Sequence, residues 1–540
     1  MKNILKIMIL TAIFAYMSSC SGWLDLTPTS DLTDKAVWEN EENADLYVNG
    51  FYTYLNQYGQ FGWQQFQGSL TESLTNTFKY GSYALGHKAG HPNNYVFNPS
   101  VITTAGCFYD NWNDGYNKIR RMNEFLKSMQ KYSTFSKEKN TLLEAQTRFF
   151  RAFIYFELAK RHGGVILYTD LEQIQNNKNR STEKETWDLV ETDLDFAIAN
   201  LPDAWNSSSD NGRLTKYVAL AFKSRAMLYA QRWQSAYDAA NLVISSNKFG
   251  LMDNYADAYA GNNKEAILQF DYKIVGPFHY FDRDYAPLSD GWEYGGLGTP
   301  TQEMVECYED TLGNKVDWAP YHKPVTTRPD YEKLDKRFRA TVIYPGSKWK
   351  GNIMQNSVNG TYGAFMAYRA QPYTYGYTTT GYFLRKLMDE KHTDLKGTPS
   401  TQPWVEIRYA EVLLNKAEAA YRLNKATEAQ TAMNAVRARK SINLPAKTST
   451  GEEWLKDYRN ERKVELAYEG QLFWDMRRWK LAHIEYNNYR CHGFKITGTN
   501  YEYIDVDYQD RKFLEKTYIL PIPDDELKNN SAVVQYDAWK

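Results

Sequence analysis

Carboxylate and guanidinium side chains alternate in the segment from Arg459 to Lys480 (RNERKVELAYEGQLFWDMRRWK). Two carboxyl groups held across a cleft would supply the acid–base chemistry of a glycoside hydrolase. Here Glu465, Glu469 and Asp475 all have arginines nearby in the sequence, which favours ion pairs between packed helices over a catalytic pair. The chain contains 65 acidic residues, and a catalytic carboxyl pair elsewhere among them is the alternative interpretation.

Other motifs of catalysis or metal binding are missing or incomplete. The sequence has no H-E-x-x-H, no G-x-S-x-G and no glycine-rich phosphate loop. His87 and His91 are four residues apart, but the glycines and the proline around them oppose the helix that would aim both at one metal. The segment DVDYQD (505–510) lacks the glycine and the distal glutamate of an EF-hand loop. We therefore predict no catalytic residue, no metal site and no cofactor.

Aromatic side chains indicate a different kind of site. The chain contains 15 Trp, 43 Tyr and 25 Phe, and many stand among glycine and asparagine in stretches without a helical period. A tryptophan or tyrosine ring packs on the C–H face of a sugar, while neighbouring polar groups bind the sugar hydroxyls. We predict that two such stretches together form a glycan site. Its expected ligand-binding residues are Tyr80, Tyr83, Trp292, Tyr294, Trp349 and Tyr375.

Trp292 is the strongest single choice among these residues. Tryptophan offers the largest stacking surface, and this one lies between an Asp-Gly pair at 290–291 and a Gly-Gly pair at 295–296. Glycine neighbours leave a ring uncovered, whereas rings at helical spacing are consumed by packing. The alternative for each ring is that it pins its loop to the core.

Helical periods surround the aromatic stretches. Alanines alternate with aromatic residues at helical spacing around residues 144–162, 182–201, 216–247 and 407–439, as in tetratricopeptide helices. Thr182 and Glu185 form a capping box, and residues 266–270 read as a short strand. The predicted fold class is mainly α, with about four degenerate tetratricopeptide-like helix pairs, large irregular loop regions and minor short strands.

The N-terminus carries a targeting segment. Lys2 and Lys6 precede a short apolar run, and Met17-Ser18-Ser19-Cys20 reads as a lipobox. We expect a signal peptide at 1–19, acylation of Cys20, and a lipid-anchored tether at 20–33. Since no later apolar stretch is long enough to cross a bilayer, the lipid anchor is the only membrane contact that we predict.

Charge and cysteine content exclude other classes. The 64 basic and 65 acidic residues nearly cancel, which argues against a nucleic-acid-binding surface. Beyond Cys20 the chain has Cys107, Cys307 and Cys491, which are too few and too widely spaced for a disulfide framework.

The segment from Arg459 to Lys480 also carries a family pattern. E-R-x-x-E-x-A-x-E-G-x-x-F-x-D-x-R-R-W, from Glu461 to Trp479, resembles the hallmark of the RagB/SusD family of outer-membrane nutrient-binding lipoproteins. The opening Trp23-Leu24-Asp25, the helix that begins at Trp112 and the closing segment 518–523 (YILPIP) are similar to the same family. Leu472 stands where the family often has arginine, and Asn530-Ser531 replaces its Asn-Pro.

This resemblance implies an organisation and a function. It implies a SusD-like fold with an N-terminal helical part at 34–248, containing a loop insertion at 57–105. A RagB/SusD C-terminal part would follow at 249–540, with a loop-rich insertion at 271–403 and the signature helix pair at 459–480. The implied partner is a SusC-like TonB-dependent transporter, over which the lipoprotein acts as a lid that captures glycans at the outer membrane, facing the cell exterior.

Two other functions are alternatives to this one. A lipid-anchored glycan hydrolase or lyase would use the same aromatic surfaces together with a carboxyl pair. A third interpretation stays within binding, since some members of the family are thought to capture peptides. The sequence does not identify the sugar, because the expected ligand residues lie in loops that match no motif.

The lipobox yields the first testable prediction. Cys20→Ala removes the thiol that accepts the lipid, so the variant should move from the membrane fraction to the soluble fraction. Fractionation followed by immunoblotting measures this, with Cys107→Ala as the control that should stay with the membrane. Unchanged membrane association of the Cys20 variant would contradict the lipobox interpretation.

Overall fold

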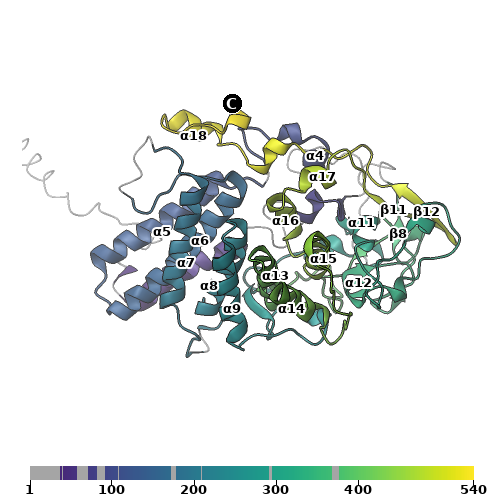
Figure 1. The fold of residues 1–540 in the computed structure, drawn as a ribbon, viewed down its shortest axis with the longest axis horizontal. Coiled ribbons are helices and arrows are strands. Elements are labelled where there is room, and N and C mark those ends of the chain that lie inside the picture. Colours follow the sequence, from purple (N-terminus) through teal and green to yellow (C-terminus); the bar gives the residue numbers. More distant parts are fainter. Residues whose placement is uncertain are drawn as a thin grey trace, which may run out of the picture.

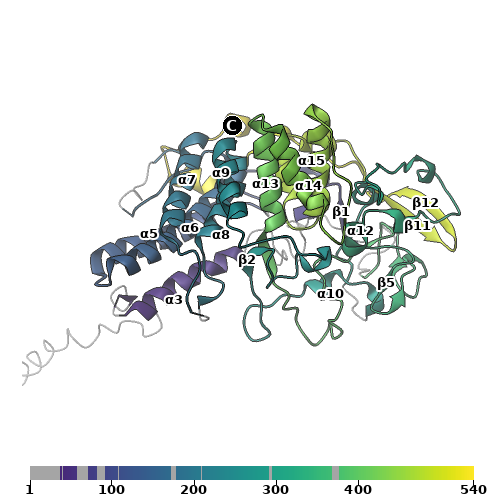
Figure 2. The same cartoon turned by 60° about the horizontal axis from the view of Figure 1, so that its bottom comes forward.

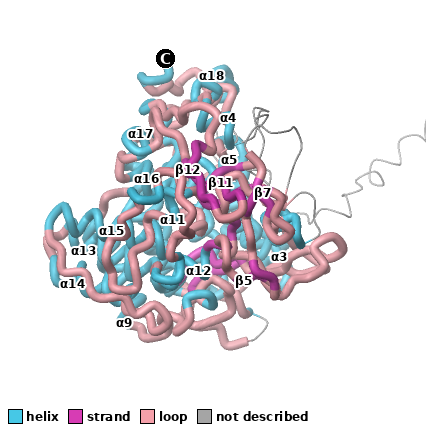
Figure 3. The backbone as a smooth tube through the Cα atoms, turned by 90° about the vertical axis from the view of Figure 1, so that its right-hand side faces the viewer, coloured by secondary structure: helices cyan, strands magenta, loops and turns pink. Residues whose placement is uncertain are grey.

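The computed structural model describes residues 37–38, 40–56, 71–81, 92–107, 109–171, 178–207, 210–290, 295–367 and 376–540. Figure 1 shows a row of helices that occupies one end of the molecule and continues through its middle. Short strands and irregular segments occupy the other end, where Figure 3 shows the strands in magenta. The mainly helical fold class predicted from the sequence is confirmed.

The helices of the row pack side by side in nearly sequential order. The pairs α6–α7, α8–α9 and α13–α14 are its repeating units, and α9 packs on α13 across a long break in the sequence. Figure 2 shows α3 lying beneath α5 and α6. The helices are α3 (Glu41–Tyr52), α5 (Trp112–Tyr132), α6 (Lys137–His162), α7 (Glu183–Asn200), α8 (Lys216–Tyr229), α9 (Trp233–Ser245), α13 (Tyr409–Arg422), α14 (Ala426–Arg437), α15 (Gly451–Glu465) and α16 (Leu472–Arg478).

The alternation of alanine and aromatic residues explains this packing. Phe149 and Phe153 of α6 lie 5.5 Å and 5.4 Å from the ring of Phe222 in α8, measured between ring centroids. Ala219 and Ala226 on α8 are completely buried, so their small side chains let the neighbouring helix approach. Removal of these apolar faces from water stabilises the array, as in tetratricopeptide proteins.

The predicted capping box starts α7. Glu185 donates its backbone N–H to the hydroxyl of Thr182 at 3.1 Å, and its carboxylate accepts the backbone N–H of Thr182 at 2.8 Å. Two of the N–H groups that a helix start leaves without partners are thereby satisfied. The sequence therefore placed this helix start correctly.

The strands pair two by two, and each pair links distant parts of the chain or closes a short loop. Residues 266–270 form β2, as expected, which pairs with β10. The pairs are β1 (Phe78–Tyr80) with β3 (Gly298–Pro300), β2 (Ala266–Phe270) with β10 (Trp404–Arg408), β4 (Val342–Ile343) with β9 (Phe383–Leu384), β5 (Lys348–Trp349) with β6 (Asn352–Ile353), β7 (Ser357–Val358) with β8 (Ala364–Phe365), and β11 (His492–Thr497) with β12 (Asn500–Asp505).

Short helices and an aromatic core support the strand-rich end. The core is rich in tyrosine and includes Phe338 and Trp404, each at most 2 % exposed. Many of the tyrosines counted in the sequence are therefore consumed in packing. The short helices are α4 (Pro92–Phe97), α10 (Phe281–Tyr285), α11 (Gln302–Val305), α12 (Lys336–Thr341), α17 (Ala482–Glu485) and α18 (Asp524–Asn529).

The C-terminal segment runs back over the helical row (Figure 1). Leu520 donates its backbone N–H to the carbonyl oxygen of Arg161 in α6 at 2.8 Å. The hydroxyl of Tyr536 donates to the carbonyl oxygen of Gly164 at 2.7 Å. In the described part of the chain, no helix combines the length and the apolar content that crossing a bilayer requires.

A buried ionic cluster joins the helical row to the strand-rich end. Glu465, the last residue of α15, binds Arg337 of α12 at 2.9 Å. It also binds Arg408, the last residue of β10, and Arg439, which follows α14, at 2.7 Å each. All four side chains are at most 1 % exposed. One carboxylate therefore connects four elements that are distant in sequence.

Three more carboxylates extend this cluster, and each bridges two cations. The pairs are Glu265 with Arg408 and Arg439, Glu461 with Arg337 and Arg437, and Glu469 with Arg408 and Lys386. Arg462 separately binds Asp475 at 2.6 Å. The prediction that Glu465, Glu469 and Asp475 are ion-paired is confirmed. Only Asp475, however, pairs with arginines of its own segment, Arg462 and Arg478. The partners of Glu465 and Glu469 lie in distant segments, which the sequence did not indicate. Arg477 differs, since it donates to the carbonyl oxygen of Thr517.

The electrostatics of the cluster agree with a structural role. Burial opposes ionisation of Glu465, but Arg439, Arg408 and Arg337 outweigh it and hold its pKa well below the ordinary glutamate value. A general acid in a glycosidase needs the opposite shift. A folded-state pKa below the unfolded value means that this stability is present at neutral pH and is lost as the pH falls below about 4.

The second prediction tests this cluster. Glu465→Ala leaves three buried arginines short of an anion, so the free energy of unfolding should fall by about 3–5 kcal/mol. Chemical denaturation measures the loss. Glu502→Ala is the matched control, because Glu502 is 49 % exposed in a surface pair with Lys495 and should matter little. A stable Glu465 variant that loses only ligand affinity would show that the cluster is a binding site.

Candidate functional site

The β1–β3 pairing joins the two aromatic stretches that the sequence predicted to converge. Tyr80 of β1 lies opposite Gly298 of β3, and Phe78 lies opposite Pro300. Just beyond the pairing, Gly81 donates its backbone N–H to the carbonyl oxygen of Leu297 at 2.7 Å. Residues from the first irregular stretch thus lie beside residues from the second.

A third stretch meets the same place. Gly376 donates its backbone N–H to the carbonyl oxygen of Gly295, and Leu288 donates to the carbonyl oxygen of Gly376 at 2.9 Å. Three segments of the chain, 82–91, 291–294 and 368–375, therefore begin or end within one hydrogen-bonded group of residues. We call this group, made of Gly81, Leu288, Gly295, Leu297 and Gly376, the loop anchor.

Glycine is required within the loop anchor for a reason that differs from the one expected. A Cβ atom on Gly295 would lie 2.1 Å from the carbonyl oxygen of Ala286. Gly376 has a φ of +79°, and its Cβ would lie 2.6 Å from that of Leu288. Both glycines permit close approach of two backbones. The role expected from the sequence, in which glycine leaves neighbouring rings uncovered, is not the reason for these two glycines.

Four of the predicted ligand residues belong to the segments that the loop anchor holds. Tyr83 follows Gly81 by two positions, Trp292 and Tyr294 stand between Asp290 and Gly295, and Tyr375 directly precedes Gly376. All four lie outside the described residues, and so does Cys20. Their assignment as ligand residues stays a prediction, while the meeting of their flanking residues is observed.

The expected exposure of Tyr80 and Trp349 is wrong. Tyr80 is 6 % exposed within β1, and Trp349 is 1 % exposed within the strand-rich core. The indole N–H of Trp349 donates to the carboxylate of Asp290 at 3.0 Å. Strand pairing and core packing cover both rings, so neither offers a face on which a sugar could stack. Trp349 instead holds the residue that precedes segment 291–294.

The turn between α15 and α16 (residues 466–471), which we call the signature turn, packs against β1 and the residues that precede it. Between α15 and α16, the hydroxyl of Tyr468 donates to the carbonyl oxygen of Thr77 at 3.1 Å. Gly470 donates its backbone N–H to the carboxylate of Glu72 at 2.9 Å. The ring of Tyr468 lies 5.0 Å from that of Phe78. The signature motif recognised in the sequence therefore packs against β1 and the residues that precede it.

Two carboxyl groups near the loop anchor have raised pKa values. Burial raises the pKa of Glu72 to about 7 and that of Asp284 to about 6. Glu72 is 1 % exposed and Asp284 is 6 % exposed. Arg283 donates to Asp284 at 2.9 Å. Both groups serve packing and backbone bonding here, and neither is open to a substrate as a catalytic acid would be.

The aspartates of the segment 505–510 are engaged in ion pairs. Asp507 is buried and binds Arg511 at 2.7 Å and Lys79 at 3.4 Å. Asp505 and Asp510 both bind Arg490. Guanidinium and ammonium groups thus occupy the carboxylate oxygens that a calcium ion would need.

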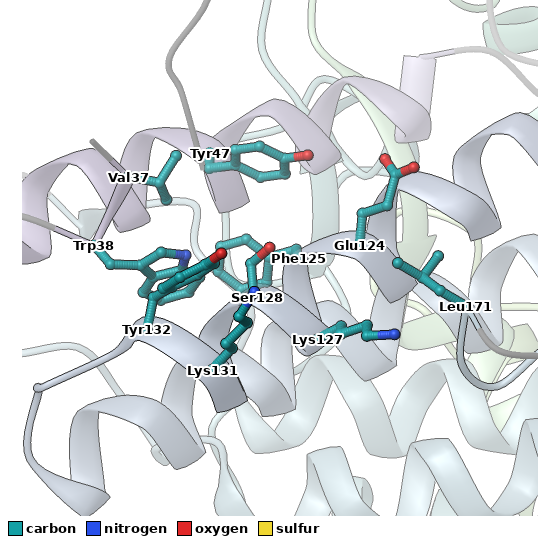
Figure 4. A pocket seen from close by; sticks show the side chains of 10 residues that line it. All are labelled: Val37, Trp38, Tyr47, Glu124, Phe125, Lys127, Ser128, Lys131, Tyr132 and Leu171. Atoms are coloured by element: carbon teal, nitrogen blue, oxygen red, sulfur yellow. The ribbon is translucent and has the colours of Figure 1, made fainter. Parts of the chain in front are cut away.

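One cavity lies between α3 and α5 and has a volume of about 460 Å³ (Figure 4). Its inner wall is aromatic: the rings of Trp38 and Tyr47 each lie 5.1 Å from Phe125. Lys127 and Lys131 line it from α5. No pattern in the sequence indicated this opening.

A second cavity lies between α12, β5 and the chain at 385–391, with a volume of about 780 Å³. Basic side chains, including Lys336, Arg339 and Lys348, surround it. Both cavities fall in the size range of small-molecule sites. Sequence reasoning missed this one, although the density of Lys and Arg between 333 and 350 was a usable signal.

Comparison with known proteins identifies the class. Residues 253–539 match the model of the SusD family, and residues 22–228 match a second model described as "starch-binding associating with outer membrane". The first match covers more than half of the chain. The chain belongs to the SusD family, which confirms the resemblance seen in the signature segment.

Individual relatives agree with this membership. A "SusD-like protein P38" from Formosa agariphila is 23 % identical over 508 residues, covering 89 % of this chain and 92 % of the relative. The solved structure of a SusD-like protein from Bacteroides fragilis is 26 % identical with a TM-score of 0.80, covering 94 % and 99 %. A second structure from the same organism, titled a SusD-like carbohydrate binding protein, is 24 % identical with a TM-score of 0.76, covering 92 % and 99 %.

The third prediction concerns Trp349. Trp349→Ala removes a ring from a packed core, so the free energy of unfolding should fall by about 3–5 kcal/mol. Thermal and chemical denaturation measure this. Tyr362→Ala is the control, because Tyr362 is 38 % exposed in the same region and should leave stability almost unchanged. Normal stability of the Trp349 variant would contradict its role in core packing and would make its ring a candidate for sugar stacking again.

Proposed function

We propose that this protein is a surface glycan-binding lipoprotein that captures oligosaccharides or polysaccharides and passes them to a SusC-like TonB-dependent transporter. The observation that carries the proposal is the loop anchor. It brings together described residues that flank three segments, in whose sequences stand Tyr83, Trp292, Tyr294 and Tyr375. Membership of the SusD family and the carbohydrate-binding title of a structural relative support it.

The described residues that flank the three segments are fixed by the packed part of the protein. Gly81 and Leu297 of the loop anchor adjoin β1 and β3. The signature turn is hydrogen-bonded to the residue before β1, and its Glu469 belongs to the buried ionic cluster. An anchor of this kind holds the described flanks of three segments next to one another, as a binding site built from several segments requires. A face of aromatic rings between polar groups suits a pyranose, which has apolar C–H faces and hydroxyl edges.

Binding without hydrolysis is the form of activity that we propose. Near the loop anchor the described carboxylates are buried or ion-paired, as are Glu72 and Asp284, which leaves no exposed pair among them to span a scissile bond. The second family model, whose description reads "starch-binding associating with outer membrane", supports the surface location and a saccharide ligand. The peptide-binding alternative predicts retention of peptides and no retention of glycans.

The fourth prediction tests the place of binding. Trp292→Ala should weaken glycan binding at least about tenfold, or about 1.4 kcal/mol, because it removes the largest stacking ring. Tyr83→Ala should weaken it less, since a tyrosine offers a smaller face. Affinity electrophoresis against a polysaccharide panel identifies the ligand, and calorimetry then measures each variant.

The control is Phe278→Ala, an aromatic residue of the same loop-rich part that is 44 % exposed and lies outside the loop anchor. Its affinity should equal that of the native protein, and all three variants should keep the native melting temperature within a few degrees. Unchanged binding by both Trp292→Ala and Tyr83→Ala would place the ligand elsewhere. Release of sugar products during incubation would replace the binding proposal with the enzyme.

A further inference from the structure

The cavity beside α12 has features that the proposed function does not use. Its volume of about 780 Å³ is large enough for a short oligosaccharide, and all of its lining residues belong to the described part of the chain. Its lining carries five basic side chains (Lys336, Arg339, Lys348, Arg385 and Lys391) and three acidic ones (Asp257, Asp389 and Glu390). The cavity therefore has an excess of two positive charges.

Partners inside the protein neutralise only part of this charge. Arg385 binds Glu390 at 2.6 Å. Arg339 donates to the carbonyl oxygen of Glu332 at 3.1 Å, an uncharged partner. Within the described residues, the ammonium groups of Lys336, Lys348 and Lys391 form no ion pair. Three lysines and one arginine at the rim are thus available to an anion that enters the cavity.

Tyr344 adds a hydrogen-bonding group to the lining of the cavity beside these charges. Tyr344 is 7 % exposed and lines the cavity, while its ring packs between Tyr331 and Phe338 at centroid distances of 5.1 Å and 5.0 Å. Its hydroxyl forms no hydrogen bond with any described residue. Because the packed ring fixes the position of the hydroxyl, this group is placed to donate to a molecule in the cavity.

The floor of the cavity is fixed by the ionic cluster. The hydroxyl of Tyr255 donates to the carbonyl oxygen of Glu465 at 2.8 Å and accepts a hydrogen bond from Lys386 at 2.7 Å. The hydroxyl of Tyr259 donates to the carbonyl oxygen of Ala340 at 3.1 Å. Aromatic side chains held in this way form a preorganised floor, whereas the exposed lysines at the rim are free to adjust.

We propose that this cavity is a second binding site, which takes an acidic sugar and binds the carboxylate of a hexuronate residue. Arg339 and Lys336 would bind the carboxylate, and the Tyr344 hydroxyl would donate a hydrogen bond to it or to the adjacent ring oxygen. The saccharide nature of the ligand rests on the proposed function, while the requirement for an anion comes from the charges of the cavity. Arg339 suits a carboxylate because its planar guanidinium can donate two parallel hydrogen bonds.

The experiment uses the full chain and trigalacturonate as the probe, with neutral galactotriose and inorganic sulfate as comparison probes, in calorimetric titrations. We expect trigalacturonate to bind more tightly than either comparison probe. Tyr344→Phe should weaken trigalacturonate binding several-fold without lowering the melting temperature, since the lost hydroxyl has no partner in the described protein. Lys336→Gln combined with Arg339→Gln should weaken binding about tenfold or more, and raising the ionic strength should weaken the native protein similarly.

The control variant combines Lys184→Gln with Lys456→Gln, which removes the same charge from exposed positions on α7 and α15. It should bind trigalacturonate as the native protein does. Equal affinity for galactotriose, equal affinity for sulfate, or unchanged trigalacturonate binding in both cavity variants would overturn the proposal. Loss of trigalacturonate binding in Trp292→Ala alone would overturn it too, because the acid would then bind at the loop segments and the proposed function would stand.

Discussion

The carboxylate of Glu465 is the interaction on which the rest of the structure depends. It lies at the end of α15, and its three arginines belong to α12, β10 and the chain after α14. Moving four charged groups out of water is costly, and the geometry must be near ideal to offset that cost. The charged groups share their partners. Arg408 binds three carboxylates, and Glu265, Glu461, Glu465 and Glu469 each bind at least two cations. Such a network tolerates only one relative placement of its elements, so it fixes the strand-rich end against the helical row.

The ionic cluster is connected to two regions of the surface. Through Tyr468 and Gly470, the signature turn supports β1 and the loop anchor. Through Tyr255, the carbonyl group of Glu465 itself supports the floor of the basic cavity. Trp349 separates the two surfaces, since its ring closes one wall of the cavity while its N–H holds Asp290 beside segment 291–294. A single packed unit thus underlies both proposed sites.

Helices and scaffold were predictable from the sequence, whereas the site was predictable only as a region. Alanine and aromatic spacing reports burial on one face of a helix, and a capping box such as Thr182 with Glu185 reports a helix start, because both signals are local.

The exposure of Tyr80 and Trp349 was misjudged because it depends on partners far away in the sequence: Gly298 for one and Asp290 for the other. The same nonlocality hid the basic cavity, whose walls come from residues 254 to 442. The convergence of the aromatic stretches was nevertheless anticipated, since helical scaffolds present long insertions on a common face.

The bond between Glu72 and Gly470 spans 398 positions of the chain, and that between Thr77 and Tyr468 spans 391. Contacts of such long range carry a large loop-closure entropy and form late in folding. A chain that emerges N-terminus first can complete α5 to α9 from neighbouring segments, but it cannot seat β1 until almost its whole length is present. The helical row is therefore expected to mature before the surface that it displays. A truncated or stalled chain is expected to form the helices of the row without the β1–β3 pair and the loop anchor. Folded structure would then appear before the proposed binding surface does.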